Sequence, residues 1–372
     1  MPKRYRSRIT IIGMSSLLVA FISCGAFGRE YGSRLDKQER NALATISAQS
    51  LAGHLTFLAS DLLEGRGTPS RGLDVAATYI AAQFQRAGLA PVGDDGYFQT
   101  ADWVPRRRGA TEPESTPPKV RNVIGLLRGS DKKLADTYIL ITAHYDHLGI
   151  KVDAPDGADR IFNGANDDGS GVVSVIELAS VLASMPKAPK RSLVFMAYYG
   201  EELGLVGSRY YADHPIFPLA QTVANINLEQ VGRNDDSENP GPGVATVTGI
   251  DYSDVGAILR KAGELQGIRV YKHETNSDAF FSRSDNRPLA DRGVPAHSFA
   301  TSFQFPDWHK LGDHADQIDY VNMEKVNRAL AHAILMIATD AREPQWNASQ
   351  PKADRYRTAR EAARDRAPGA KD

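Results

Sequence analysis

The chain has 372 residues, of which 42% are hydrophobic and 24% are charged, which is enough for one large globular domain. A formal net charge of −1 gives no electrostatic reason to expect binding to nucleic acid or to an anionic membrane surface. The only cysteine is Cys24, so no internal disulfide is expected.

The first 24 residues predict an export signal. Basic residues precede an apolar stretch over residues 9–23, which is too short for a confident membrane span. Cys24 at its end predicts a bacterial lipoprotein with a lipid anchor, although Phe21 stands where such signals carry leucine. Ordinary cleavage or an uncleaved anchor remain alternatives. We therefore expect an exported protein, periplasmic or membrane-anchored, or else secreted.

A polar tether over residues 25–42 is expected to lead into helices. Apolar residues recur at helical spacing over residues 43–87, and the stretch 65–72, which contains Pro69, separates two helices. Residues 102–119 are rich in Arg, Glu and Pro and predict a loop.

Beyond this loop, apolar runs of strand length alternate with helical patterns. Strands are expected at 123–127, 138–142, 193–198, 223–228, 244–248 and 296–300, and helices at 172–182, 203–211, 255–265 and 321–338. This alternation predicts an α/β fold, a three-layer α/β/α sandwich around a mixed, mostly parallel sheet. One domain is expected over residues 43–340, followed by a charged, flexible tail over 341–372.

Several side chains that can bind a metal ion follow the predicted strands. They are His144, Glu201, Glu202, Glu229 and His309. Because the carboxyl ends of parallel strands meet at one edge of a sheet, we expect these side chains to converge there. Imidazole and carboxylate are good ligands for zinc. Each residue alone also has a simpler explanation as a strand end, a turn or a helix cap.

Two pairs of acids suggest how such a site would work. A carboxylate at the helix start 166–171 can bridge two metal ions, and we assign this role to Asp167, with Asp168 orienting the loop. Adjacent carboxylates repel unless a cation is near, so in the second pair Glu202 is expected to bind metal and Glu201 to act as the general base. Asp146 is expected to accept the other ring N–H of His144.

These motifs resemble the di-zinc exopeptidases of metallopeptidase family twenty-eight, which include aminopeptidases and relatives of glutamate carboxypeptidase, transferrin receptor and glutaminyl cyclase. The likeness runs from residues 55–66 to the closing helix. Its strongest matches are His144-x-Asp146, residues 166–171, Gly200-Glu201-Glu202-Leu203-Gly204-Leu205-x-Gly207-Ser208, Arg283-Ser284-Asp285 and residues 309–319. The resemblance implies a phosphorylase/hydrolase-like zinc-exopeptidase fold.

The resemblance also implies roles for individual residues. His144 and Glu229 would bind one zinc ion, Glu202 and His309 the other, and Asp167 would bridge the two, with Glu201 as base. Family members often have a cis peptide bond after the bridging aspartate, here between residues 167 and 168.

Three features depart from the family pattern. Glu229 stands where an aspartate is usual, and Trp308 where a tyrosine often stabilises the oxyanion; an indole N–H is the only donor that tryptophan offers. No long insertion separates Gln99 from Val123, so the protease-associated domain of some relatives is expected to be absent.

The sequence thus predicts an exported zinc aminopeptidase that holds two zinc ions, or cobalt or manganese, and removes N-terminal residues from peptides. Arg283 and Trp308 are expected to contact substrate, and Phe303 and Phe305 to line a side-chain pocket. His147, His297 and His314 are interpreted as structural. The alternatives are a carboxypeptidase or dipeptidase, a glutaminyl-cyclase-like acyltransferase and a non-catalytic cell-envelope binding protein. The oligomeric state stays open.

Overall fold

The computed structural model describes residues 31–32, 34–104 and 117–366, so the predicted export signal and Cys24 lie outside the described residues. The chain divides into two units, Met1–Glu30 and Tyr31–Asp372, and the fold below is that of the second. In the parts of the chain that the structure describes, no helix is long and apolar enough to cross a membrane.

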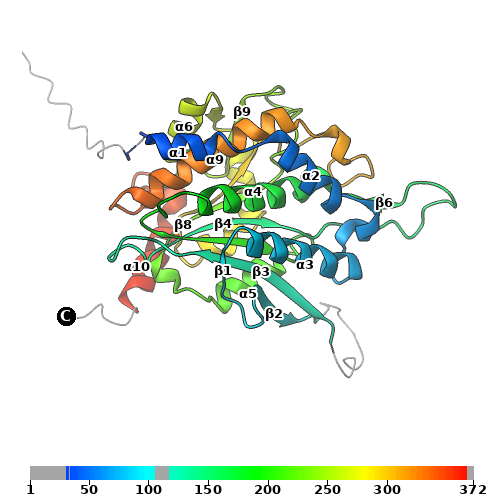
Figure 1. The fold of residues 1–372 in the computed structure, drawn as a ribbon, viewed down its shortest axis with the longest axis horizontal. Coiled ribbons are helices and arrows are strands. Elements are labelled where there is room, and N and C mark those ends of the chain that lie inside the picture. The colour runs from blue at the N-terminus through cyan, green and yellow to red at the C-terminus, as the bar shows by residue number, and fades with distance from the viewer. Residues whose placement is uncertain (1–30, 33, 105–116, 367–372) are drawn as a thin grey trace, which may run out of the picture. The chain divides into compact units, whose positions relative to one another are not determined.

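A mixed sheet of nine strands forms the middle layer of this unit (Figure 1). The strands are β1 (Ala90–Pro91), β2 (Phe98–Asp102), β3 (Lys119–Leu127), β4 (Tyr138–His144), β7 (Ser192–Tyr198), β8 (Thr222–Leu228), β9 (Val244–Val247), β10 (Arg269–Tyr271) and β11 (Ala296–Ala300). Their order is β1-β3-β7-β4-β8-β11-β9-β10, and β2 pairs with β3. The central strands β7, β4, β8 and β11 run parallel, whereas β3 and β9 join them antiparallel. A separate hairpin joins β5 (Gly149–Ile150) to β6 (Ile161–Phe162).

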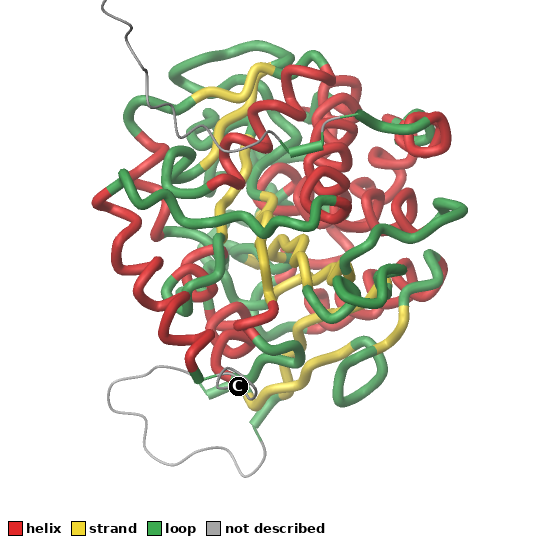
Figure 2. The backbone as a smooth tube through the Cα atoms, turned by 90° about the vertical axis from the view of Figure 1, so that its left-hand side faces the viewer, coloured by secondary structure: helices red, strands yellow, loops and turns green. Residues whose placement is uncertain are grey.

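Helices cover both faces of the sheet, as Figure 2 shows with strands in yellow and helices in red. One face carries α1 (Lys37–Leu43), α2 (Ala48–Leu58), α3 (Arg71–Arg86), α4 (Gly171–Ala183), α6 (Asp254–Gln266) and α9 (Tyr320–Thr339); the other carries α5 (Val206–Asp213), α8 (Asn286–Ala290) and α10 (Asp354–Asp365). The short helix α7 (Asn276–Ala279) lies between β10 and α8 in the chain. Successive residues of a strand point to opposite faces. Accordingly Ile139 and Ile141 of β4 enter the first core and Leu140 enters the second. The predicted three-layer α/β sandwich is confirmed.

The structure adds the strands β1, β2 and β10 to those expected, and it places helices in the segments expected to be a tether and a flexible tail. The expected tether is already helical from Lys37, because Asp36 and Glu39 form a capping box and Leu43 is buried. The segment expected to be a flexible tail contains α10, which packs on the second core through the buried Tyr356. Arg360, one helical turn later on the same face, donates to the backbone carbonyls of Leu219 and Thr222 at 2.9 Å each. The many charged residues of this segment led to the prediction of a flexible tail, although one face of α10 is buried.

Candidate metal centre

The candidate ligands lie at one edge of the sheet, beyond the carboxyl ends of its parallel strands. His144 is the last residue of β4, Glu229 directly follows β8, and Glu201 and Glu202 lie in the loop after β7. Asp167 lies in the turn that opens α4. His309 comes from the loop after β11, which extends far enough to reach the same edge. The predicted convergence of these side chains is therefore present in the structure.

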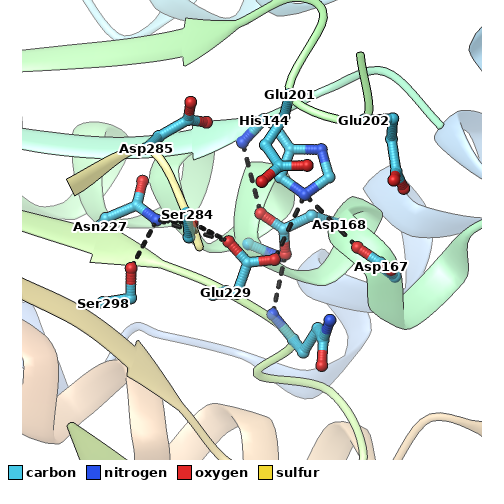
Figure 3. Close-up of polar contacts among 12 residues, drawn as sticks. His144, Asp167, Asp168, Glu201, Glu202, Asn227, Glu229, Ser284, Asp285 and Ser298 are labelled. Atoms are coloured by element: carbon cyan, nitrogen blue, oxygen red, sulfur yellow. Dashed lines mark hydrogen bonds and ion pairs between the residues drawn. The ribbon is translucent and has the colours of Figure 1, made fainter. Parts of the chain in front are cut away.

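One carboxylate lies between the two histidines. Asp167 Oδ1 is 3.3 Å from His144 Nε2, and Asp167 Oδ2 is 3.2 Å from His309 Nε2. On the outer sides, Glu229 Oε1 is 3.3 Å from His144 Nε2, and Glu202 Oε2 is 3.2 Å from His309 Nε2. Figure 3 shows Asp167 and Glu229 both directed at the same ring nitrogen of His144. Two sets of three side chains thus share Asp167.

These spacings fit two zinc ions. Ligand atoms about 2.0–2.1 Å from a tetrahedral zinc ion lie about 3.3–3.4 Å from one another. Each of the four nitrogen–oxygen pairs above has nearly this separation. The donor atoms, imidazole nitrogen and carboxylate oxygen, also suit zinc better than calcium or magnesium, because those two ions favour oxygen ligands alone. The residues present therefore fit the metal that their pattern predicts.

The electrostatics of the site favour a bound cation. Hydrogen bonds that the His309 ring donates to the carboxylates of Asp167 and Glu202 raise the pKa of His309 to about 10. Burial lowers the pKa of His144, yet Glu229 and further carboxylates outweigh burial and bring that pKa well above its ordinary value. Burial and the nearby Glu229 raise the pKa of Asp168. The carboxylates therefore favour positive charge at the two histidines, whose hydrogen bonds in turn, despite burial, lower the pKa of Asp167 and help to lower that of Glu202. A bound dication would relieve the repulsion between the carboxylates in the same way.

Asp146 and Asp168 both support the site, by contacts that differ in part from those expected. His144 Nδ1 lies 3.2 Å from the backbone carbonyl of Asp146 and 3.6 Å from its carboxylate, so the carbonyl is the closer acceptor. The Asp146 carboxylate instead accepts the backbone N–H of Glu201 at 3.1 Å. Asp168 accepts backbone N–H groups of His144, Gly171 and Gln230 at 3.0–3.3 Å.

The contacts of Asp168 decide between the two adjacent aspartates. Asp168 lies close enough to His144 and Glu229 to form a metal-binding group with them. Its oxygens, however, are engaged by three backbone donors, whereas the carboxylate of Asp167 faces both histidines. The geometry therefore favours Asp167 as the shared ligand. The peptide bond between the two residues is cis, as the resemblance implied.

A polar network that the sequence did not reveal holds Glu229. The Ser284 hydroxyl donates to Glu229 Oε2, and Asn227 Nδ2 donates to Ser284 Oγ at 2.9 Å and to Ser298 Oγ at 3.0 Å (Figure 3). Asn227 and Glu229 are two residues apart, so they point to the same face of β8 and its extension. A buried asparagine in an apolar strand was the signal that could have identified this network.

His147 was interpreted as structural, but it belongs to the site. Its Nδ1 lies 2.8 Å from Glu202 Oε1, and its side chain is buried. Together with Asp167 and Glu202 it forms a group of side chains that could hold a metal ion. His297 instead bonds to Ser253 and to the Thr248 carbonyl in the core. His314 is half-buried, with its Nε2 3.6 Å from Asp159 Oδ2. The second histidine of the motif at residues 144–147 thus orients a predicted ligand.

Buried Arg66 and Asp313 hold the loop that carries Asp167. Arg66 donates to the backbone carbonyls of Tyr145, Asn163 and Gly164 at 2.7–2.9 Å, tying the end of β4 to this loop. Asp313 accepts the backbone N–H groups of Asn166 at 2.9 Å and Asp167 at 3.0 Å. Both residues lie in segments that carried the resemblance, but their roles appear only in the folded chain.

A cavity of about 390 Å³ opens beside the ligands. It is lined by Asp167, Glu201, Glu202, Glu229 and His309, together with the predicted substrate contacts Arg283 and Trp308. Phe303 also lines it, whereas Phe305 does not and instead packs under Arg233. Glu201 is the one carboxylate of this lining without an ion pair to a histidine among the described residues, and burial raises its pKa well above the ordinary value.

Comparison with known proteins gives a consistent result. The model of peptidase family M28 matches residues 122–334. A probable zinc metalloprotease of Pyrenophora teres f. teres is 31% identical over 210 residues, which cover 54% of this chain and 42% of the relative. Aminopeptidase YwaD of Bacillus subtilis is 28% identical over 214 residues, covering 56% and 42%. The chain therefore spans less than half the length of these curated relatives.

A solved structure extends the comparison to the fold. The LapA aminopeptidase of Legionella pneumophila superposes with a TM-score of 0.64 at 20% sequence identity. The match covers 85% of this chain and 78% of that chain. At this identity the likeness establishes the α/β architecture.

Proposed function

Since the chain belongs to peptidase family M28, we propose that it is a zinc-dependent aminopeptidase that hydrolyses the first peptide bond of its substrates. The observation that carries the proposal is the Asp167 carboxylate, which lies between His144 and His309 while Glu201 lines the same cavity. The similarity to proteins named zinc metalloprotease and aminopeptidase supports it.

His144, Asp167, Glu202, Glu229 and His309 would hold two zinc ions. When bound, the ions would polarise the scissile carbonyl and acidify a water molecule. Glu201 then accepts the proton of the attacking water and passes it to the leaving amine. Burial raises the pKa of Glu201 well above its ordinary value, which favours uptake of the proton from the attacking water. The hydrogen bond from the Glu201 backbone N–H to the Asp146 carboxylate fixes the start of the loop that carries Glu201.

The same site supplies groups for the rest of the substrate. The free amine of an N-terminal residue would lie near the carboxylates that line the cavity. Trp308 lines the cavity next to His309, and its indole N–H can donate to the oxyanion in place of a tyrosine hydroxyl. Phe280 and Phe303, in edge-to-face contact, offer an apolar surface to a side chain.

Purified protein loaded with zinc should cleave aminoacyl-p-nitroanilides with a free amine and leave N-acetylated versions essentially uncut. The reason is that an aminopeptidase recognises the charged amine, which acetylation removes. Release of nitroaniline measures both rates, and elemental analysis should find close to two zinc ions per chain. Equal cleavage of free and blocked substrates would remove the assignment as an aminopeptidase.

We also propose that the protein is exported and anchored by lipid at Cys24. The basic and apolar residues before Cys24 support this proposal. Mass spectrometry of the protein from bacterial membranes should find a mature chain that begins at Cys24 and carries acyl groups. A mature chain that begins elsewhere without lipid would leave export but exclude the anchor, and a cytoplasmic chain that retains residues 1–24 would exclude both.

A further inference from the structure

Three arginines line the cavity that contains the candidate ligands. They are Arg209 of α5, Arg283 after the short 3₁₀ turn Phe280–Ser282, and Arg287 of α8. Arg209 and Arg287 also line an adjoining cavity of about 260 Å³, together with Arg292, Asp213 and Asp291. We call Arg209, Arg283 and Arg287 the arginine wall.

The charges of the arginine wall are poorly neutralised. In the described part of the chain, Arg209 and Arg283 form no ion pair, and the Arg283 guanidinium lies over the Phe280 ring at 4.7 Å from its centroid. Arg287 reaches Asp291 only through Nε at 3.5 Å, and Asp291 also pairs with Arg355. By contrast Arg292, which lines only the adjoining cavity, forms an ion pair with Asp213.

The charge balance of the cavity follows from the proposed function. Its four lining acids are Asp167, Glu201, Glu202 and Glu229. Two bound dications would neutralise the charge of these carboxylates, and the arginine wall would then leave the cavity positive. A positive cavity walled by protein attracts an anionic substrate and concentrates it.

We propose that the arginine wall selects substrates that carry a carboxylate close to the scissile bond. Guanidinium groups bind carboxylates through paired hydrogen bonds, and Arg283 is held in place by its stacking on Phe280. The carboxylate belongs either to an aspartate or glutamate side chain at the residue that is removed, or to the free C-terminus of a dipeptide. The inference rests on the proposed peptidase and names its substrate class.

Two pairs of substrates distinguish these sources. Glutamyl- and glutaminyl-p-nitroanilide have the same shape and differ in charge, and alanyl-alanine differs from its amide only at the C-terminus. The zinc-loaded enzyme should prefer the acidic member of at least one pair by at least about tenfold in kcat/KM, because hydrogen bonds to charged groups are the stronger ones. A preference for glutamyl- over glutaminyl-p-nitroanilide would show that the wall binds a side-chain carboxylate. A preference for alanyl-alanine over its amide would show that it binds the C-terminal carboxylate.

Variants of the wall connect this preference to its residues. Arg209→Gln and Arg283→Gln should each bring the acidic-to-neutral ratio of kcat/KM toward one, whereas Arg209→Lys, which keeps the charge, should retain part of it. Arg292→Gln is the matched control: it removes the same charge from a neighbouring arginine outside the metal cavity and should leave the ratio unchanged. A ratio equally sensitive to Arg292→Gln would overturn the assignment to the wall.

Direct binding separates this inference from the proposed function. Calorimetry with the zinc-loaded protein should show tighter binding of glutamate than of glutamine, or of alanyl-alanine than of its amide, independently of turnover. If no substrate is cleaved but this preference in binding is seen, the peptidase is wrong and the arginine wall stands. If substrates are cleaved without any preference for the acidic member, in rate or in binding, the wall is wrong and the peptidase stands.

Discussion

Glu201→Gln should keep both zinc ions and lose about 10²- to 10⁴-fold in kcat, the range that general acid–base groups contribute. Glutamine has the shape of glutamate but cannot accept and return a proton. Glu201 lines the cavity without an ion pair to a histidine among the described residues, so its loss should leave the ligand cluster intact. Nitroaniline release gives kcat, and elemental analysis of the same sample gives the zinc content.

The control for this variant is Glu264→Gln. Glu264 lies on α6 and is exposed, and among the residues that the structure describes its one ion pair is with Lys261, one turn away. Its substitution should leave kcat within about twofold, as surface changes away from a site usually do. Turnover of Glu201→Gln equal to that of the control would show that another group serves as the base. Loss of zinc in Glu201→Gln would instead show that Glu201 is a ligand.

Asp167→Asn should abolish activity and reduce the zinc content below one ion per chain. Asp167 places one oxygen beside each histidine, so a single substitution weakens both halves of the site. An amide offers one neutral oxygen and cannot bridge two cations. Even residues that only support a ligand cost about 10- to 100-fold in metal affinity, and the shared ligand should cost more. Titration with zinc against a competing chelator measures the affinity.

Asp156→Asn is the matched control for the bridging residue. Asp156 is an exposed aspartate in the connection between β5 and β6, so it undergoes the same chemical change without facing the cluster. It should bind zinc as the parent chain does. If Asp167→Asn also retains two zinc ions, Asp168, whose carboxylate lies near His144 and Glu229, would be the candidate for the shared ligand.

The sequence predicted much of this site because most of its residues can be recognised from their position next to an apolar strand. Each of His144, Glu201, Glu202 and Glu229 stands at or just beyond the end of an apolar strand, and the rule for the carboxyl edge of a parallel sheet brings such residues together. His309 was harder to place, because it lies in a loop; the resemblance to known exopeptidases supplied its role. The three-layer fold followed from the alternation of buried strands and helices.

Other parts depended on contacts between segments that are distant in the chain. The bond from Ser284 to Glu229, the contact of His147 with Glu202 and the anchoring of the Asp167 loop by Arg66 have no periodic signal. The buried face of α10 was also missed. Only two of its residues, Tyr356 and Arg360, are buried, which is too few to produce a periodic pattern of apolar residues. These residues look like ordinary polar or charged positions until their partners are known.

By itself, then, the sequence determined the central strands with the helices that alternate with them, the edge at which the ligands gather and the type of chemistry that they can perform. Local periodicity and motifs suffice for these features, since they depend on which residues lie near one another along the chain. The sequence favoured Asp167 over Asp168 as the shared ligand, and the tertiary structure added the distances that place its carboxylate beside both histidines. Only the tertiary structure shows that three arginines from α5, α8 and the loop between α7 and α8 line one cavity. Those facts depend on how helices pack and on where loops cross, which short-range patterns do not encode.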